Sequence, residues 1–120
     1  MKCIDYTAED YWDSILNASF SKFFILRALL DSPAHGYEII RRVSSLTEGL
    51  YIPTEGTIYP VMREFLDCAC VSCSEEVVNG RTRKVYALTA KGHGAYQAGV
   101  DIWQRGIHCV ERVIASEDRI

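Results

Sequence analysis

Three cysteines lie within six positions of the chain, at Cys68, Cys70 and Cys73. Thiolates are soft ligands that suit Zn²⁺ or Cu⁺, and they can also be oxidised reversibly. The spacing Cys-x-Cys-x-x-Cys lacks the second cysteine pair that makes a zinc site a specific prediction. On one regular strand, Cys70 and Cys73 would also point to opposite faces. The pattern therefore leaves open a metal or metalloid site, a redox switch and a purely structural role.

A bound ion would need a fourth ligand, for which the sequence offers Cys3, Cys109, His108 or a residue of another subunit. The chain has five cysteines, an odd number, and its N-terminus does not have the pattern of a secretory signal. We therefore expect the thiols to be reduced rather than paired in disulfides.

The composition of the 120 residues is that of one ordinary globular domain. The longest apolar run is far shorter than the ~20 residues that span a bilayer, so we expect a soluble cytoplasmic protein without membrane contact. The net charge of −3 gives no general attraction to nucleic acid, so a DNA-binding surface would need local clustering of cations. No Ser/His/Asp order, carboxylate pair or glycine-rich phosphate loop stands out, which argues against an enzyme.

An N-terminal helix is predicted to begin after Thr7, which precedes two acidic residues that suit a helix start. The chain is predicted to restart at Asn17 or Ser19. A second, mostly buried helix is expected over 21–30, and it ends before Pro33 because proline disfavours helix in the residue before it.

Two more helices and a β-hairpin are predicted in the middle of the chain. The first helix covers 36–46, and the second begins at the N-cap Thr54. Asn79-Gly80 between two strand-like runs is the strongest short signal for a hairpin, and the second arm starts with cations. The inner face of the helix after Thr54 is predicted to consist of Ile58, Val61, Met62 and Phe65.

Thr89 is predicted to cap a long last helix, whose apolar residues are spaced alternately by four and three positions. Such a seam can pack on helices of the same chain. A broad apolar face on the terminal helix of a small domain is also a natural dimer surface. We favour a dimer whose interface consists of Tyr96, Val100, Trp103, Ile107, Val110 and Ile114.

This order of elements predicts a mainly α fold with a small β-hairpin, of the winged helix-turn-helix class. We divide it into an N-terminal helical extension (1–18), a DNA-binding domain (19–90) and a C-terminal dimerisation helix (91–120). In this class, the start of a short helix enters the major groove and the basic hairpin contacts the backbone or the minor groove. The residues expected to bind DNA are Thr54, Thr57, Tyr59 and Arg63 on the helix and Arg81, Thr82, Arg83 and Lys84 on the hairpin.

The chain resembles the PadR family of bacterial transcriptional regulators in three stretches, FFILRALLDSPAHGYEIIRRV, PTEGTIYPVMREF and GRTRKVYALTAKG. The resemblance runs from about Phe23 to Gly92, and the single last helix is similar to the small subfamily. It implies a homodimeric repressor on operator DNA with two half-sites about a helical turn apart. Its motifs add Tyr37, Gly56 and Pro60 to the expected DNA-binding residues.

The sequence differs from the usual family pattern at three positions. Glu55 puts a carboxylate at the start of the recognition helix, where its repulsion of phosphate would weaken non-specific binding. Ala69 stands where the family commonly has glycine, so the end of this helix is expected to lack an easy left-handed residue. Cys70 matches a usually aliphatic position, which favours a buried core thiol.

Trp103 has two interpretations. A large aromatic residue on a helical seam is commonly a core anchor. The resemblance implies a further role, because multidrug-responsive members of the small subfamily sandwich flat aromatic ligands between paired tryptophans at a matching position. A small aromatic effector would then be bound by Trp103, Tyr96 and Ile107, with Phe24 or Trp12 nearby.

Two alternatives to a ligand-responsive repressor stay open. The first is a regulator that responds to a thiophilic metal ion, a metalloid or redox change through Cys68, Cys70 and Cys73. The second is a winged-helix module for protein–protein contact without DNA binding, which fits the acidic isoelectric point of about 5.6.

Overall fold

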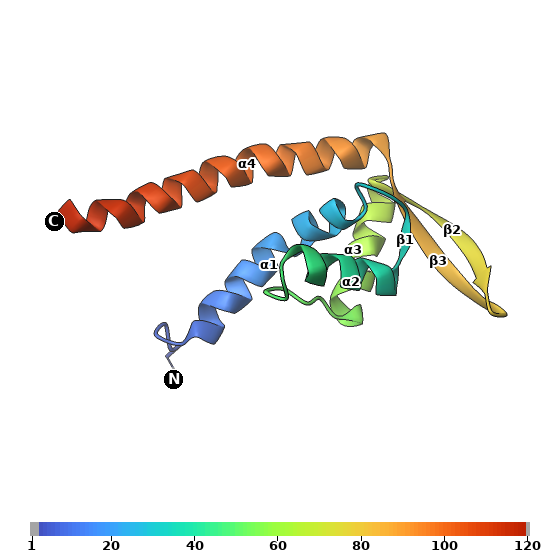
Figure 1. The fold of residues 1–120 in the computed structure, drawn as a ribbon, viewed down its shortest axis with the longest axis horizontal. Coiled ribbons are helices and arrows are strands. Elements are labelled where there is room, and N and C mark those ends of the chain that lie inside the picture. Colours follow the sequence, from blue (N-terminus) through green and yellow to red (C-terminus); the bar gives the residue numbers. More distant parts are fainter. Residues whose placement is uncertain (1–2, 120) are drawn as a thin grey trace.

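Two long helices frame the chain in the computed structural model, which describes residues 3–119. In chain order the elements are α1 (Glu9–Ala28), β1 (Ala34–His35), α2 (Gly36–Leu46), α3 (Glu55–Asp67), β2 (Val71–Val78), β3 (Arg81–Leu88), α4 (Ala90–Ala115) and the 3-10 turn η1 (Ser116–Arg119). α1 and α4 diverge toward the two termini, and the β2–β3 hairpin projects from the other end (Figure 1). This arrangement confirms the predicted winged helix-turn-helix class with a long C-terminal helix.

Residues 1–2 and 120, the ends of the predicted extension and dimerisation helix, lie outside the described residues. Within residues 3–119, no helix combines the length and the apolar character needed to cross a bilayer.

The hydrophobic core lies where α1, α2 and α3 meet. Almost completely buried there are Ile25 of α1, its C-cap residue Leu29, Ile39 of α2, and Ile58 and Met62 of α3. Burying such side chains contributes roughly 1.5–3 kcal/mol each relative to leaving them exposed. The predicted inner face of α3 is confirmed, since its four members are all buried: Ile58, Val61, Met62 and Phe65.

α1 is one continuous helix, so the predicted restart at Asn17 or Ser19 was wrong. The first cap was wrong as well, because Ala8 precedes the helix and Thr7 instead donates hydrogen bonds to the Asp5 carboxylate at 2.6 and 3.0 Å. Asparagine and serine have only a weak preference against helix interiors, which tertiary packing overrides. Here the packing is the stacking of Phe20 on Trp103 and of Phe23 on Tyr96, which joins α1 to α4.

The hairpin has the predicted two-residue turn. Asn79 and Gly80 have φ values of 51° and 76°, as a type I′ turn requires, and Val78 pairs with Arg81 across it. The sheet is antiparallel with strand order β1-β3-β2. The two-residue strand β1, which the sequence analysis missed, pairs only with Tyr86 and Val85. The sheet edge of β3 beyond Val85 is therefore not covered by β1.

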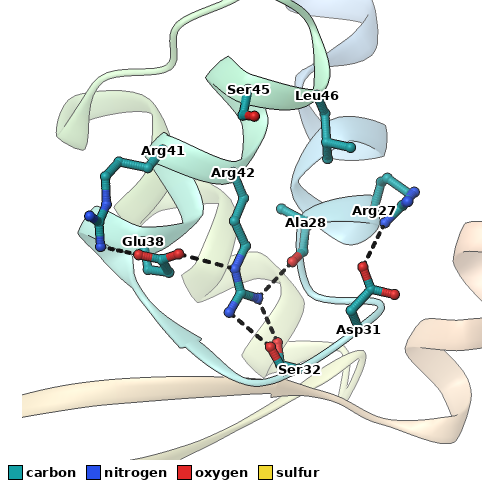
Figure 2. A pocket seen from close by; sticks show the side chains of 9 residues that line it. All are labelled: Arg27, Ala28, Asp31, Ser32, Glu38, Arg41, Arg42, Ser45 and Leu46. Atoms are coloured by element: carbon teal, nitrogen blue, oxygen red, sulfur yellow. Dashed lines mark hydrogen bonds and ion pairs between the residues drawn. The ribbon is translucent and has the colours of Figure 1, made fainter.

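Arg42 fixes the angle between α1 and α2. Its guanidinium group donates hydrogen bonds to the Ala28 carbonyl at 3.0 Å and to the Ser32 carbonyl and hydroxyl oxygens at 2.8 Å (Figure 2). It also lies 3.5 Å from the carboxylate of Glu38, which forms a second ion pair with Arg41. Arg42 thus satisfies the carbonyl group of the last residue of α1 and ties it to the turn that follows.

Thr54 and Thr89 occupy the predicted N-cap positions, and His35 is a further N-cap. The His35 ring accepts a hydrogen bond from the Glu38 N–H at 3.3 Å, so this histidine caps α2. Thr89 caps α4 by accepting from the Gly92 N–H at 3.1 Å. Thr54 is the N-cap residue of α3, but its hydroxyl lies 3.3 Å from that of Thr57 instead of bonding to the backbone.

The start of α4 is hydrogen-bonded to the end of α3. The Thr89 N–H donates to the Cys70 carbonyl at 3.1 Å, and the Thr89 hydroxyl donates to the Ala69 carbonyl at 2.7 Å. The Lys91 ammonium group donates to the Cys68 carbonyl at 2.7 Å. A Cβ atom on Gly92 would overlap the Cys70 carbonyl oxygen and lie 2.6 Å from Leu88 Cδ1, so this approach requires glycine.

The end of α3 corrects the expectation for Ala69. This alanine adopts the left-handed conformation, with φ of 60°. The Cys70 N–H donates to the Phe65 carbonyl at 2.8 Å and the Ala69 N–H to the Leu66 carbonyl at 3.0 Å, which is a Schellman motif. The bonds to Thr89 and Lys91 hold the chain in this conformation although alanine disfavours it.

Replacing Ala69 by glycine is expected to stabilise the fold by about 1 kcal/mol, because glycine reaches the left-handed region without a steric cost. The measurement is urea unfolding at a fixed protein concentration. Ala98→Gly is the matched control, since Ala98 is exposed inside α4. There the same change should destabilise by roughly 0.5–1 kcal/mol. A loss of stability in both variants would contradict the strain at Ala69.

Candidate nucleic-acid interface

A hollow of about 480 Å³ lies where the start of α2, the middle of α3 and the free edge of β3 converge. It joins six of the residues predicted to bind DNA, which come from three separate stretches of the sequence. They are Tyr37, Tyr59, Arg81, Thr82, Arg83 and Lys84, and His35, Gly36 and Tyr86 complete the lining. The cationic stretch of the hairpin therefore borders the same space as the tyrosines of the helix-turn-helix.

Tyr59 and Gly36 pack against each other in the lining of this hollow. A Cβ atom at Gly36 would lie 3.3 Å from the Tyr59 hydroxyl, so the tyrosine ring packs closely against the first turn of α2. Tyr37 is 64% exposed and Tyr59 is 47% exposed. Their hydroxyl groups can therefore donate hydrogen bonds to a phosphate outside the protein.

Tyr86 forms the floor of the hollow and is 4% exposed. Burial raises the pKa of its phenol, and the neighbouring Cys73 and Tyr59 raise it further. The phenol therefore stays neutral at physiological pH and adds no negative charge beside the cations.

The remaining predicted DNA-binding residues lie along α3 and do not line the hollow. Thr54 and Gly56 are exposed at its start, with Thr57 partly exposed behind them. Pro60 and Arg63 are exposed further along the helix. The start of α3 thus presents free backbone N–H groups and small side chains, which suit close approach to DNA. Glu55 also lies in this first turn and is exposed.

The hollow includes three residues that the sequence analysis did not assign to DNA binding. Tyr86 pairs with Ala34 and Cys73 in the sheet, and this register determines that its ring faces inward. Alternation along the strand could have placed Tyr86 on the face of Lys84 and Thr82. His35 and Gly36 reach the hollow because β1 joins the sheet just before α2. A strand of two residues is too short to show an alternation of polar and apolar residues in the sequence.

A second, apolar cavity of about 460 Å³ lies between α1 and α4. We call it the aromatic cavity. The Trp103 ring stacks on Phe20 with centroids 4.1 Å apart, and Tyr96 stacks on Phe23 at 5.2 Å. Four of the five predicted effector residues line it, namely Phe24, Tyr96, Trp103 and Ile107.

The fifth predicted effector residue, Trp12, lies elsewhere. Its indole N–H donates to the Tyr6 carbonyl at 2.8 Å, and its side chain is 58% exposed. Phe20 and Phe23 line the cavity instead, and the analysis missed both. Phe20, Phe23 and Phe24 have the i, i+3, i+4 spacing that places side chains on one helix face. This spacing could have predicted their shared location.

The apolar seam of α4 has two different environments. Tyr96, Val100 and Trp103 are partly buried, and the two aromatic rings stack on α1 of the same chain. The other three seam residues are exposed, at 47% for Ile107, 56% for Val110 and 58% for Ile114. Ile102 and Val113 widen this exposed apolar surface, at 57% and 64%.

The three clustered cysteines have separate environments. Cys70 is 8% exposed and belongs to the core, as predicted, whereas Cys68 and Cys73 are exposed. Among residues 3–119, no group of three or more His, Cys, Asp or Glu side chains lies close enough to hold a metal ion. The geometry therefore gives the thiol-based alternative no preformed three-ligand site within this part of the chain.

Comparisons with known proteins agree with this architecture. The transcriptional regulator YqjI of Escherichia coli K12 is 34% identical over 71 residues, which are 59% of this chain and 33% of that protein. The chain thus spans about a third of the length of this curated relative. A transcriptional regulator from Clostridium thermocellum superposes with a TM-score of 0.75 at 19% identity, covering 82% of this chain and 96% of that one.

Bacillus subtilis PadR, solved in complex with operator DNA, superposes with a TM-score of 0.61 at 20% identity. The match covers 67% of this chain and 46% of that chain. At such identities the two structures show the shared fold. The family model for PadR-like transcriptional regulators matches residues 25–98, which is more than half of the chain. The predicted resemblance is thereby confirmed: the chain belongs to the PadR-like family, whose members are transcriptional regulators and not enzymes.

Proposed function

We propose that this chain is a cytoplasmic, homodimeric repressor that binds an operator with two half-sites and responds to a small aromatic ligand. The observation that carries the DNA-binding part is the convergence of Tyr37, Tyr59 and the cations 81, 83 and 84 in one hollow beside α3. A surface of this kind offers hydrogen-bond donors and positive charge to a phosphate backbone. Bacillus subtilis PadR, which shares the fold, was solved in complex with operator DNA, and this supports DNA binding by the present chain.

On this proposal α3 is the recognition helix, and the β2–β3 hairpin, residues 71–88, is the wing. The first turn of α3 would enter the major groove, where Thr54 and Thr57 can reach base edges or phosphates. The wing cations would bind phosphates alongside. The tyrosine hydroxyls would fix the register of the protein on the duplex without reading its sequence.

The exposed half of the α4 seam supports the homodimer. Ile107, Val110 and Ile114 form a continuous stripe on a helix that extends past the rest of the chain (Figure 1). An apolar stripe of this kind is a typical protein interface. A second copy of α4 would cover it, and a two-fold axis there would present two α3 helices to two half-sites.

Alanine substitution of Arg81, Arg83 and Lys84 together should weaken DNA binding and reduce its salt dependence. Each phosphate contact contributes about 0.9 to the slope of log K against log salt. The slope should therefore fall by about 2–3 for each wing that contacts DNA. Fluorescence anisotropy with a labelled duplex, titrated over a range of NaCl concentrations, measures both quantities.

The matched control replaces Lys22, Arg105 and Arg112 by alanine, which removes the same charge from exposed positions on α1 and α4. This control should bind nearly as the unchanged protein does. Equal affinities and slopes for both triple variants would contradict the wing assignment and favour a protein-interaction role.

The aromatic cavity supports the response to a ligand. Its lining offers stacked rings on two sides, from Phe20 and Trp103 and from Phe23 and Tyr96. Planar apolar molecules bind well to such surfaces because aromatic rings favour offset stacking. A ligand between α1 and α4 would change the position of α4, whose first residues are bonded to α3.

A planar acridine dye is expected to quench the fluorescence of Trp103 saturably. Trp12→Phe leaves Trp103 as the single tryptophan and should retain the quenching, because Trp12 lies outside the cavity. The matched variant Trp103→Phe leaves only Trp12 and should lose it. Quenching of equal size in both variants, or none in either, would contradict a ligand site at Trp103.

A further inference from the structure

Two carboxylates lie directly opposite two of the three wing cations. In the register of the wing, Glu75 pairs with Lys84 and Glu76 pairs with Arg83. Residues that face each other across antiparallel strands have Cβ atoms about 4.5–5.5 Å apart. Arg81 differs from the other two cations, since the residue opposite it is Val78.

The two pairs lie on opposite faces of the wing, because side chains alternate along a strand. Glu75 and Lys84 share the face of the buried Tyr86, whereas Glu76 and Arg83 share the other face. All four side chains are exposed. Each face of the wing therefore carries one cation that lies directly opposite a carboxylate.

Glu75 and Glu76 form no close ion pair with the cations opposite them. The ion pairs among residues 3–119 all lie within α1, α2, α3 and the turn after α1, and none includes Glu75 or Glu76. The carboxylates therefore act on their partners through space. The Cβ spacing of about 4.5–5.5 Å in such pairs is shorter than the screening length of about 8 Å at physiological salt. A phosphate that approaches either cation is therefore also repelled by the carboxylate opposite it.

We propose that Glu75 and Glu76 lower the affinity of the wing for DNA of any sequence, because they repel the phosphates that the wing cations would bind. This inference rests on the proposed DNA-binding function. Non-specific binding depends almost entirely on phosphate neutralisation, whereas base contacts made by α3 are far less affected by charges on the wing. The carboxylates thus reduce the term that is common to all sequences.

The test uses Glu75→Gln/Glu76→Gln, which keeps the size and polarity of both side chains. Binding to a labelled duplex of random sequence is measured by anisotropy over a range of NaCl concentrations. The variant should bind about 3–10-fold tighter at ~0.1 M salt, and the slope of log K against log salt should steepen by about 1–2. The control Glu111→Gln/Glu117→Gln makes the same charge change at exposed positions on α4 and η1 and should bind as the unchanged protein does.

Affinity and slope equal to those of the control would overturn the inference. Glu75→Gln in a Lys84→Ala background tests the pairing itself, and it should give no gain once the cation is absent. A gain of full size in that background would mean general repulsion, and it would overturn the paired mechanism. The proposed function fails by a different result, namely that removing Arg81, Arg83 and Lys84 leaves the binding of the random duplex unchanged.

Discussion

The hydrogen bonds between the start of α4 and the end of α3 are the constraint on which the rest of this structure depends. Thr89 and Lys91 bond to the carbonyl groups of three consecutive residues, 68–70, and Gly92 allows the backbones to meet. These are the carbonyls at which the recognition helix ends and the wing begins. The helix proposed to read DNA, the wing and the helix proposed to join two copies are thus held together at one point.

This junction gives the aromatic cavity and the DNA face a physical connection. The cavity involves residues 96–107 of α4, which follow the bonds from Thr89 and Lys91 on the same helix. A shift of α4 against α1 would act on the end of α3 through short, well-formed hydrogen bonds. The cysteine-rich stretch lies in the middle of this connection. Cys70 contributes a buried core side chain and a carbonyl group that accepts a hydrogen bond from Thr89.

Much of the fold could be predicted from the sequence, because strong local signals agreed with the tertiary packing. Asn79-Gly80 and the inner face of α3 are examples, since turn chemistry and helical spacing act over a few residues. The incorrect predictions concern residues whose conformation is determined by tertiary contacts. Asn17 does not interrupt α1 because aromatic packing on α4 overrides a weak preference, and Ala69 turns left-handed because Thr89 and Lys91 bond around it. The hollow proposed to bind DNA brings together residues that the sequence analysis had singled out, but β1, which completes it, is too short to leave a detectable pattern.

Amide hydrogen exchange with and without duplex DNA tests the central claim most directly, namely that two copies joined through α4 present α3 and the wing to DNA. In the free protein, the amides of 107–114 should exchange slowly, although their side chains are exposed in the single chain, because a second copy covers them. Adding the duplex should slow exchange at the start of α3 and at 79–84 and should leave 107–114 unchanged. Rapid exchange at 107–114 in the free protein, or DNA protection that spares α3 and the wing, would contradict the account.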